Sequence, residues 1–300
     1  MENPDENSLG EMKKHSRWLR WSVLVLALAN LFAWLAVGET AERKMLEVRF
    51  FDVGQGDAAF AQFPDGTQVL IDGGPNGRVL EKLGQAMPFY DRDIDWIVLS
   101  HPEKDHLAGL IAVLENYQIH NIVWSGIAKD NAESKKWGEL VAKEGANIAI
   151  ARPGEIFALG GEESGFLEIL SPDAAASDSK TSANDLSVAV KLAYGARSFL
   201  FTGDAAAKEE ESTLLAGSGQ TDVLKVAHHG SKTAASEIFM AGVLPTAAVI
   251  SAGKNNSYGH PHPEVLELLS KYDIKTLRTD ESGDIVFQTD GERIFLSTEK

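Results

Sequence analysis

The sequence predicts an α/β layered domain over residues 45–300, preceded by one apolar segment near the N-terminus. Three observations lead to this prediction. Short strand patterns alternate with helix patterns along both halves of residues 45–300, and such alternation favours layers of sheet covered by helices. Polar residues suited to chemistry follow several of the strands directly. The 18 residues between Arg20 and Glu39 carry no formal charge.

The apolar segment is long enough to cross a membrane. As a helix rising about 1.5 Å per residue, it spans roughly 27 Å, close to the thickness of a hydrocarbon core. We expect a polar tail at residues 1–17, a transmembrane helix at 18–38 and a linker at 39–44. The alternative is a signal peptide cleaved near residues 36–41. The length of the run and a late tryptophan, Trp34, favour a retained, uncleaved anchor.

Charges on either side of this segment predict its orientation. Four basic residues precede it, Lys13, Lys14, Arg17 and Arg20. Glu39 and Glu42 follow it, with Arg43 and Lys44 directly behind. The positive-inside rule places the N-terminus in the cytoplasm. We therefore expect a single-pass protein of the cell membrane with an extracytoplasmic domain.

Composition excludes several classes of function. The net charge is −16, from 28 basic and 44 acidic residues. Residues 1–44 hold six of each sign, so residues 45–300 hold 22 basic and 38 acidic side chains. This argues against a nucleic-acid binder with a basic face, and phosphate contacts have to be local or mediated by metal ions. The absence of cysteine excludes disulfides, cysteine zinc sites, iron–sulfur clusters and thiol nucleophiles.

In the first half of the domain, short apolar runs between Gly/Asp turns predict strands, and longer runs with helical spacing predict helices. The expected strands are 46–53, 58–63, 68–71, 96–99 and 121–124. The expected helices are 78–87, 107–117 and 133–144.

The second half continues the alternation around a polar low-complexity loop, residues 173–185. Helices are expected at 205–215 and at 263–272, where Pro263 suits a first helical turn. Strands are expected at 148–151, 155–157, 167–170, 187–192, 198–201, 223–226, 247–250 and 275–278, followed by a hairpin of 284–288 and 293–297.

The strongest chemical signal follows the apolar strand 96–99. It is the run Ser100-His101-Pro102-Glu103-Lys104-Asp105-His106, with four potential metal ligands within six residues. Residues 101 and 103 can point to one side of an extended loop, while 105 and 106 can face a second ion from the start of the next helix. A solvated polar loop explains any one of these residues. All four together favour a metal site.

Three further clusters stand at other strand ends or in loops. They are Thr202-Gly203-Asp204, Ala227-His228-His229-Gly230-Ser231 and Asn255-Asn256-Ser257-Tyr258-Gly259-His260-Pro261-His262-Pro263. Each alone has a structural explanation: a turn, two surface histidines or a helix cap. Six of the eight histidines nevertheless fall in three loops, those that carry residues 100–106, 227–231 and 255–263. This clustering favours a common site.

These motifs and two others occur in a recognisable order. The others are Phe51-Asp52-Val53-Gly54-Gln55-Gly56-Asp57-Ala58 and Leu70-Ile71-Asp72-Gly73-Gly74. Over residues 45–300 the chain resembles the metallo-β-lactamase superfamily, specifically the β-lactamase-like domain of ComEC-type DNA-uptake proteins. The resemblance implies an αββα four-layer sandwich with a metal site along one edge of two sheets. That family's uptake channel has many transmembrane helices, so the one span expected here does not imply transport.

The resemblance also implies roles for single residues. It assigns His101 and Glu103 to one metal ion, Asp105 and His106 to another, and Asp204 as the bridging carboxylate. His228 is favoured as a further ligand because it comes first after its strand. Asp72 is expected to support the ligand loop, and Gly54–Asp57 mainly to form a tight turn, with a direct role for Asp57 as the lesser option. The residues expected near substrate are Asn184, Ser231, Lys232, Lys254, Tyr258, His260 and His262.

Two departures from the superfamily pattern affect the choice of metal. Glu103 stands where the superfamily usually has histidine, and no histidine lies between His120 and His228. Oxygen ligands favour Mn²⁺ or Mg²⁺ relative to zinc, although the general affinity order favours Zn²⁺. We expect one or two divalent ions, Zn²⁺ or Mn²⁺, with Mg²⁺ as a further candidate. The first site can also be weak or empty.

The expected activity is metal-assisted hydrolysis of a phosphodiester by a membrane-anchored nuclease linked to DNA uptake or processing. Divalent ions lower the pKa of bound water and neutralise phosphate charge. Asp105 can orient the attacking water, and His229, His260 or His262 can donate a proton to the leaving oxygen. Two alternatives remain: a hydrolase of a small phosphoester, lactone or other ester, and a non-catalytic binding or assembly protein. The sequence indicates no protein partner.

Overall fold

The structure, a computed structural model, describes residues 18–32, 45–161, 165–172 and 182–299. The chain divides into two units, Met1–Lys44 and Met45–Lys300. In the first unit, residues 18–32 form a helix. No helix among the described residues is long and apolar enough to span a membrane. The last part of the predicted span, residues 33–38, lies outside the described residues.

Two β-sheets form the centre of the second unit. The described residues of the first sheet form eight strands, in the spatial order β15 (Ile294–Glu299), β14 (Asp284–Thr289), β1 (Leu46–Phe50), β2 (Ala59–Gln62), β3 (Gln68–Ile71), β4 (Asp93–Leu99), β5 (Gln118–Trp124) and β6 (Asn147–Ile150). Those of the second form seven, in the order β13 (Lys275–Arg278), β12 (Ala247–Ile250), β11 (Val223–Lys225), β10 (Arg197–Phe201), β9 (Val190–Tyr194), β8 (Gly165–Ile169) and β7 (Ile156–Leu159).

Each sheet has a parallel half. Strands β3 to β6 are parallel in the first sheet, and β10 to β13 in the second. The remaining pairs are antiparallel. Parallel strands deliver their carboxyl ends to one edge, where the loops after β3, β4, β10, β11 and β12 collect. The antiparallel β2 begins at the edge where β3 ends, because Ala59 pairs with Ile71.

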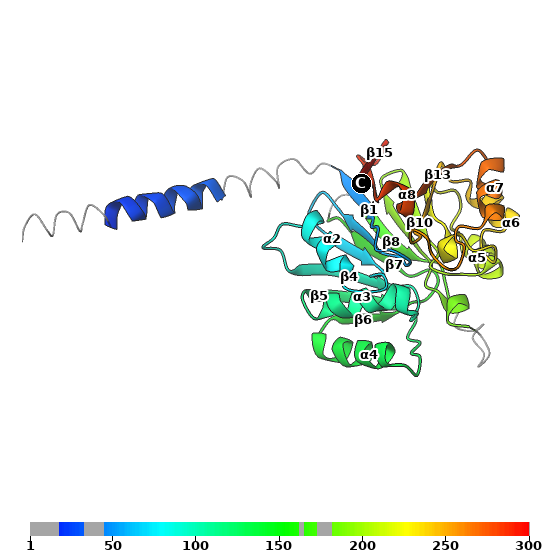
Figure 1. Cartoon of the computed structure of the whole chain (residues 1–300), viewed down its shortest axis with the longest axis horizontal. Helices are drawn as coiled ribbons and strands as arrows, with labels where there is room; N and C mark the ends of the chain where they lie inside the picture. Colours follow the sequence, from blue (N-terminus) through cyan, green and yellow to red (C-terminus); the bar gives the residue numbers. More distant parts are fainter. Residues whose placement is uncertain (1–17, 33–44, 162–164, 173–181, 300) are drawn as a thin grey trace, which may run out of the picture. The chain divides into compact units, whose positions relative to one another are not determined.

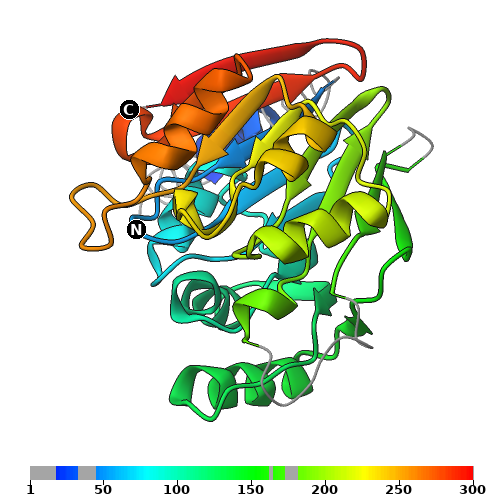
Figure 2. The ribbon, with the colours of Figure 1, turned by 90° about the vertical axis from the view of Figure 1, so that its right-hand side faces the viewer.

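Helices cover the outer faces of both sheets (Figures 1 and 2). The helices on the side of the first sheet are α2 (Arg78–Ala86), α3 (Lys104–Leu114) and α4 (Ala132–Glu144). Those on the side of the second are α5 (Ala207–Leu215), α6 (Glu237–Val243) and α7 (Pro263–Lys271). The short segments η2 (Asn184–Leu186), η3 (Ala227–Gly230) and α8 (Thr279–Ser282) complete the described elements.

Helix α6 is absent from the sequence prediction. Its seven residues are too few to show a helical period. Its start is set by Ser236, whose hydroxyl accepts a hydrogen bond from the Phe239 N–H (3.1 Å). Helix α3 begins at Lys104, inside the ligand motif and three residues before the predicted start, so Asp105 and His106 lie in its first turn.

Three separate apolar cores confirm the αββα order of layers. Phe50 and Phe287 of the first sheet lie between the sheets with Phe199 and Phe201 of the second, and the rings of Phe50 and Phe201 stack 5.6 Å apart. A second core joins the first sheet to α2, α3 and α4 and includes Leu70, Leu83, Ile97, Leu110 and Trp137. A third joins the second sheet to α6 and α7 and includes Leu200, Leu224, Phe239, Val265 and Leu269.

Glycines let the ligand-bearing turn of α3 pack closely against two loops. The Gly73 N–H donates to the His106 carbonyl (2.8 Å), and the Gly109 N–H donates to the Gly74 carbonyl (2.9 Å). A Cβ atom at Gly109 would lie 1.7 Å from the Gly73 oxygen, and one at Gly56 2.3 Å from the Asp105 oxygen. Only glycine permits these approaches, which fix the start of α3 beside the loops after β3 and before β2.

The carboxyl group of Glu210 is buried in the outer layer of the second sheet. One oxygen accepts a hydrogen bond from the Ala235 N–H (2.6 Å), while the other is buried and has no hydrogen-bond partner among the described residues. Burial raises the pKa of Glu210 from 4.5 to about 8, although the N–H groups of Ala235 and Ser236 act against the rise. The folded chain therefore keeps a proton that the unfolded chain releases.

We predict that Glu210 makes stability fall between about pH 5 and pH 8. In this window the folded state binds the extra proton, so the free energy of unfolding falls with rising pH, by up to about 1.4 kcal/mol per pH unit. The variant Glu210→Gln cannot ionise and should lose this slope. Denaturant unfolding of both proteins across the window measures the difference. Glu209→Gln, one residue away and half-buried, is the control and should follow wild type; equal slopes in wild type and Glu210→Gln would contradict the prediction.

Candidate metal centre

Four side chains converge on one point at the edge shared by the two sheets. Asp105 and His106 come from the first turn of α3, Asp204 from the loop after β10, and His229 from η3 after β11. One ligand atom from each lies within 4.8 Å of the others. Nε2 of His106 is 3.3 Å from Oδ1 of Asp204. Nε2 of His229 is 3.2 Å from Oδ2 of Asp105 and 3.7 Å from Oδ2 of Asp204. The Asp204 carboxylate thus contacts ligand residues from the side of each sheet: His106 from the first and His229 from the second.

Two more histidines flank the Asp204 carboxylate. The Nε2 atoms of His101 and His228 each lie 3.8 Å from Oδ2 of Asp204. His101 is fully buried, whereas about a third of the His228 side chain is exposed. These two residues complete an arc of imidazoles from the buried interior to the solvent, with Asp204 at its centre.

The residues present fit a divalent cation. Nε2 of His101, Nε2 of His106 and Oδ1 of Asp204 are buried and lack a hydrogen-bond partner among the described residues. Buried polar atoms are normally paired, and three such atoms facing one another need a shared partner. Imidazole nitrogens and carboxylate oxygens are ligands for zinc and manganese. The cluster is therefore able to bind metal ions.

Asp72 holds the ligand loop from behind. It follows β3 in a left-handed conformation (φ 58°). Its two carboxylate oxygens accept hydrogen bonds from the Ser100 N–H (2.8 Å) and the Ser100 hydroxyl (2.7 Å). Nδ1 of His106 lies 2.8 Å from Oδ2 of Asp72. Nδ1–H donates to this carboxylate, and the contact directs Nε2 of His106 toward Asp204.

The charges of the cluster reinforce one another. Burial raises the pKa of Asp204, but His106 and His229 lower it more, so the pKa lies well below its usual value. Burial lowers the pKa of His106, yet Asp204 and Asp72 raise it well above normal. Burial lowers the pKa of His101 to about 4, with His106 adding to the shift. The Asp204 carboxylate is thus ionised at neutral pH, and metal binding would displace protons from the imidazoles whose pKa is raised.

A strained turn presents the two adjacent histidines. His228 and His229 have φ values of 51° and 54°, a left-handed conformation that is rare for residues other than glycine. The His228 N–H donates to the Gly203 carbonyl (3.2 Å), which joins the turn to the Asp204 loop. Nδ1 of His229 donates to the Ser251 carbonyl (2.9 Å) and so directs Nε2 toward the cluster. The sequence argument favoured His228 as the ligand, whereas the structure places His229 in the converging group.

Glu103 is turned toward a lysine. It precedes α3 as its N-terminal cap residue, and its carboxylate forms an ion pair with Lys129. Among the described residues it belongs neither to the converging group nor to a second cluster of possible ligands, formed by Asp57, Asp72 and His106. Its assignment to a metal ion stays a prediction.

The sequence argument gave Asp57 only a minor role, and it did not include Lys225. Asp57 is buried between Lys225 (Nζ to Oδ2, 2.6 Å) and His229 (Nδ1 to Oδ1, 3.2 Å). Burial raises the pKa of Asp57, but Lys225 and His229 lower it far below its usual value. The signal for Asp57 was an acidic residue between Gly56 and a strand. The only sign of a role for Lys225 in the sequence is its charge, which stands at the end of an apolar strand.

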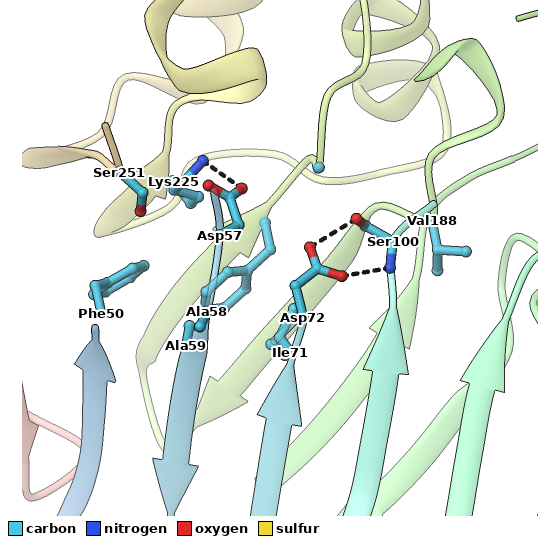
Figure 3. Close-up of a pocket in the computed structure, with 12 residues that line it drawn as sticks. Phe50, Asp57, Ala58, Ala59, Ile71, Asp72, Ser100, Val188, Lys225 and Ser251 are labelled. Carbon is cyan, nitrogen blue, oxygen red and sulfur yellow. Dashed lines mark hydrogen bonds and ion pairs between the residues drawn. The ribbon is translucent and has the colours of Figure 1, made fainter. Parts of the chain in front are cut away.

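Asp57 and Lys225 line a small cavity between the sheets, below the cluster. Figure 3 shows their ion pair beside the pair formed by Asp72 and Ser100. The cavity measures about 10 Å³, space for about one water molecule. It is too small for a substrate, so a substrate has to approach from the open rim.

Several of the residues predicted to contact substrate lie in two loops beside the cluster. Lys232 and Tyr258 are exposed, and the rings of His260 and His262 lie 4.9 Å apart. Ser231 is buried and its hydroxyl contacts that of Thr233 (3.0 Å). Asn184 lies in η2 and, among the described residues, is not part of the converging group. The rim therefore consists mainly of the loops 228–233 and 254–262.

Comparison with known proteins agrees with this architecture. The family model described as the Metallo-beta-lactamase superfamily matches residues 51–254. ComE operon protein 3 of Bacillus subtilis is 32% identical over 260 residues, which are 81% of this chain and 33% of that protein. Competence protein ComA of Neisseria gonorrhoeae is 28% identical over 278 residues, which are 89% of this chain and 35% of that protein. The chain thus spans about a third of the length of these curated relatives.

A solved structure agrees on the fold alone. The metallo-beta-lactamase fold protein YhfI from Bacillus subtilis superposes with a TM-score of 0.57 at 13% identity, over 82% of this chain and 99% of that one. The family match covers both sheets' site loops from Asp57 to His229. With its four layers and its cluster of histidines and aspartates, the chain belongs to the metallo-beta-lactamase superfamily.

Proposed function

We propose that the chain is a metal-dependent phosphodiesterase that acts as a nuclease in DNA uptake or processing. The observation that carries this proposal is the convergence of Asp105, His106, Asp204 and His229, together with three buried ligand atoms that lack a hydrogen-bond partner in the described part of the chain. Members of the metallo-beta-lactamase superfamily are generally metal-dependent hydrolases. Among the similar proteins, Competence protein ComA is named for competence and Recombination protein 2 of Haemophilus influenzae for recombination, which supports DNA as the substrate.

Divalent ions held by this cluster supply a water of lowered pKa and neutralise negative charge on a phosphate. Asp105 is the residue best placed to take a proton from the attacking water, because its side chain is about a third exposed while its Oδ2 is held by His229. Burial raises the pKa of Asp105, but His229 and His106 lower it below its usual value, so its carboxylate is ionised at neutral pH. Water attack forms the new P–O bond as the leaving oxygen departs.

The proton for the leaving oxygen has to come from the rim. Burial lowers the pKa of His260 to about 4, with His229 and His262 adding to the shift, so its imidazole is neutral at pH 7. A neutral imidazole accepts hydrogen bonds better than it donates protons. The lowered pKa argues against His260 as the donor, and His262 on the same loop is the remaining candidate of the rim. Lys232, exposed beside His262, is the basic group for the phosphate.

The metal assignment predicts the following outcome. The full chain should cleave a phosphodiester with Mn²⁺, Zn²⁺ or Mg²⁺ and should stop in EDTA. Asp204→Asn, which removes the shared carboxylate, should lower kcat/KM by more than the roughly 10- to 100-fold typical of an outer-shell change. The assay uses single-stranded and double-stranded DNA, bis-p-nitrophenyl phosphate and simple esters.

The control is Asp130→Asn, an exposed carboxylate with a side chain 93% accessible, which should retain full activity. If the protein cleaves only esters, the proposed nuclease function is wrong and the protein is a small-molecule esterase. Metal binding without turnover of any substrate would favour a binding protein. Unchanged activity in Asp204→Asn would refute the metal site.

The support given by Asp72 predicts a graded effect. Asp72→Asn keeps the size of the side chain but replaces the acceptor of the His106 Nδ1 proton with an amide. Metal affinity, measured by calorimetric titration, should fall roughly 10- to 100-fold. Asp52→Asn is the control, because the Asp52 carboxylate bonds its own loop at Gly54. Equal metal affinity in wild type and Asp72→Asn would show that Asp72 does not position His106.

We also propose that residues 18–38 anchor the chain in the cell membrane with the domain outside. The support is the run of 18 uncharged residues, the flanking tryptophans and the basic residues before it. The full chain should sediment with membranes and resist extraction by high salt, and deletion of 18–38 should release it. Protease should digest the domain when it is added to cells that have lost their outer barriers but keep an intact cell membrane. Protection of the domain there would refute the orientation.

A further inference from the structure

We propose that Tyr258 is a stacking platform for an unpaired nucleobase of the substrate, so that the site acts on single strands. The proposal rests on the phosphodiesterase function above and specifies its substrate. Tyr258 is 66% exposed at the rim of the metal centre. Surface aromatic rings beside a phosphodiester site bind bases without regard to sequence, because every base has a π face.

The loop that carries Tyr258 is held in shape by one side chain. The Asn256 amide nitrogen donates to the carbonyls of Gly253 (3.0 Å) and His260 (2.6 Å). Its amide oxygen accepts from the N–H groups of Tyr258 (3.2 Å) and His260 (3.0 Å). These four hydrogen bonds of the Asn256 side chain fix the turn formed by residues 253–260. The ring is therefore presented in a defined position, which lowers the entropic cost of binding a base.

The ring is also placed by contact with the histidines of the centre. Tyr258 stacks on His260 with a 5.7 Å centroid distance and a 21° angle between the planes. The His260 ring in turn lies 5.7 Å from that of His228 and 6.2 Å from that of His229. The Lys232 N–H donates to Nδ1 of His262 (3.1 Å), which ties this loop to the turn after β11. A continuous row of rings thus leads from the metal centre to the exposed tyrosine.

The charge of the domain makes such a platform useful. Residues 45–300 hold 38 acidic and 22 basic side chains, so most of the surface repels a phosphate backbone. Proteins that bind single strands normally combine a basic groove with aromatic stacking. Here the metal centre and Lys232 can bind phosphate only locally. Stacking supplies affinity that does not depend on net charge, and only an unpaired base can reach the ring.

The test separates base binding from cleavage. Single-stranded oligonucleotides with 2-aminopurine, and matched oligonucleotides with abasic sites, are titrated into the full chain in EDTA, where no turnover occurs. Wild type should quench the 2-aminopurine fluorescence and bind the base-bearing strand roughly 5- to 100-fold more tightly than the abasic one. Tyr258→Phe should keep this preference, and Tyr258→Ala should lose it. Between low and moderate salt, the ratio of the two affinities should stay constant.

Phe295→Ala is the matched control, since it removes another exposed aromatic ring, 48% accessible, from β15; it should behave as wild type. No binding up to millimolar oligonucleotide, or an unchanged base preference in Tyr258→Ala, would overturn the platform. A base preference without cleavage under any metal would leave the platform standing and remove the phosphodiesterase. Cleavage of strands with no base preference would support the phosphodiesterase and overturn the platform.

Discussion

The arrangement of the site depends on a single buried carboxylate, that of Asp204. It comes from the second sheet, yet the nearest ligand nitrogen, Nε2 of His106 at 3.3 Å, comes from a helix that covers the first. A carboxylate is costly to bury unless positive or hydrogen-bonding groups surround it. The histidines around Asp204 meet that requirement, and a cation would meet it better. The buried charge of Asp204 is therefore stabilised by residues from both sheets, and this interaction holds the edges of the two sheets together.

A second ring of interactions makes this geometry specific. Asp72 orients His106 through Nδ1, and Asp57 lies against Nδ1 of His229 while Lys225 compensates its charge. Both carboxylates come from loops next to β2 and β3, in the same sheet. Each ligand imidazole is thus held on the side away from the cluster. Sites of this kind lose metal affinity when the outer partners change, even though the ligands themselves remain.

The rim is built on different principles from the centre. The centre is buried, charged and held by glycine-dependent backbone approaches, such as that of Gly56 to the Asp105 carbonyl. The rim consists of loops that carry exposed side chains such as Lys232 and Tyr258, and local hydrogen bonds shape these loops, most clearly those of Asn256. Catalytic geometry needs rigid support, whereas substrate selection needs access. The same fold supplies both, because the carboxyl ends of parallel strands place buried ligands and exposed loops at one edge.

The sequence by itself predicted an α/β layered domain, its resemblance to a known family predicted the four layers, and its motifs named Asp105, His106, Asp204 and His229 as candidate site residues. Hydrophobic periodicity and turn residues are local signals, so they predict strands and helices from the sequence. Histidine and carboxylate residues, the usual metal ligands, cluster directly after the apolar strands, and this clustering predicts the site. The sequence predicted that His101, His106 and Asp204 share one site, and in the structure the Nε2 atoms of the two histidines lie 3.8 and 3.3 Å from the Asp204 carboxylate, at the edge where the ends of parallel strands meet. Only the tertiary structure decided which of His228 and His229 joins the converging group, since a left-handed turn of two residues reverses the order expected along an extended chain. It alone revealed the pairing of Glu103 with Lys129 and of Asp57 with Lys225, since these contacts join residues 26 and 168 positions apart and leave no local pattern.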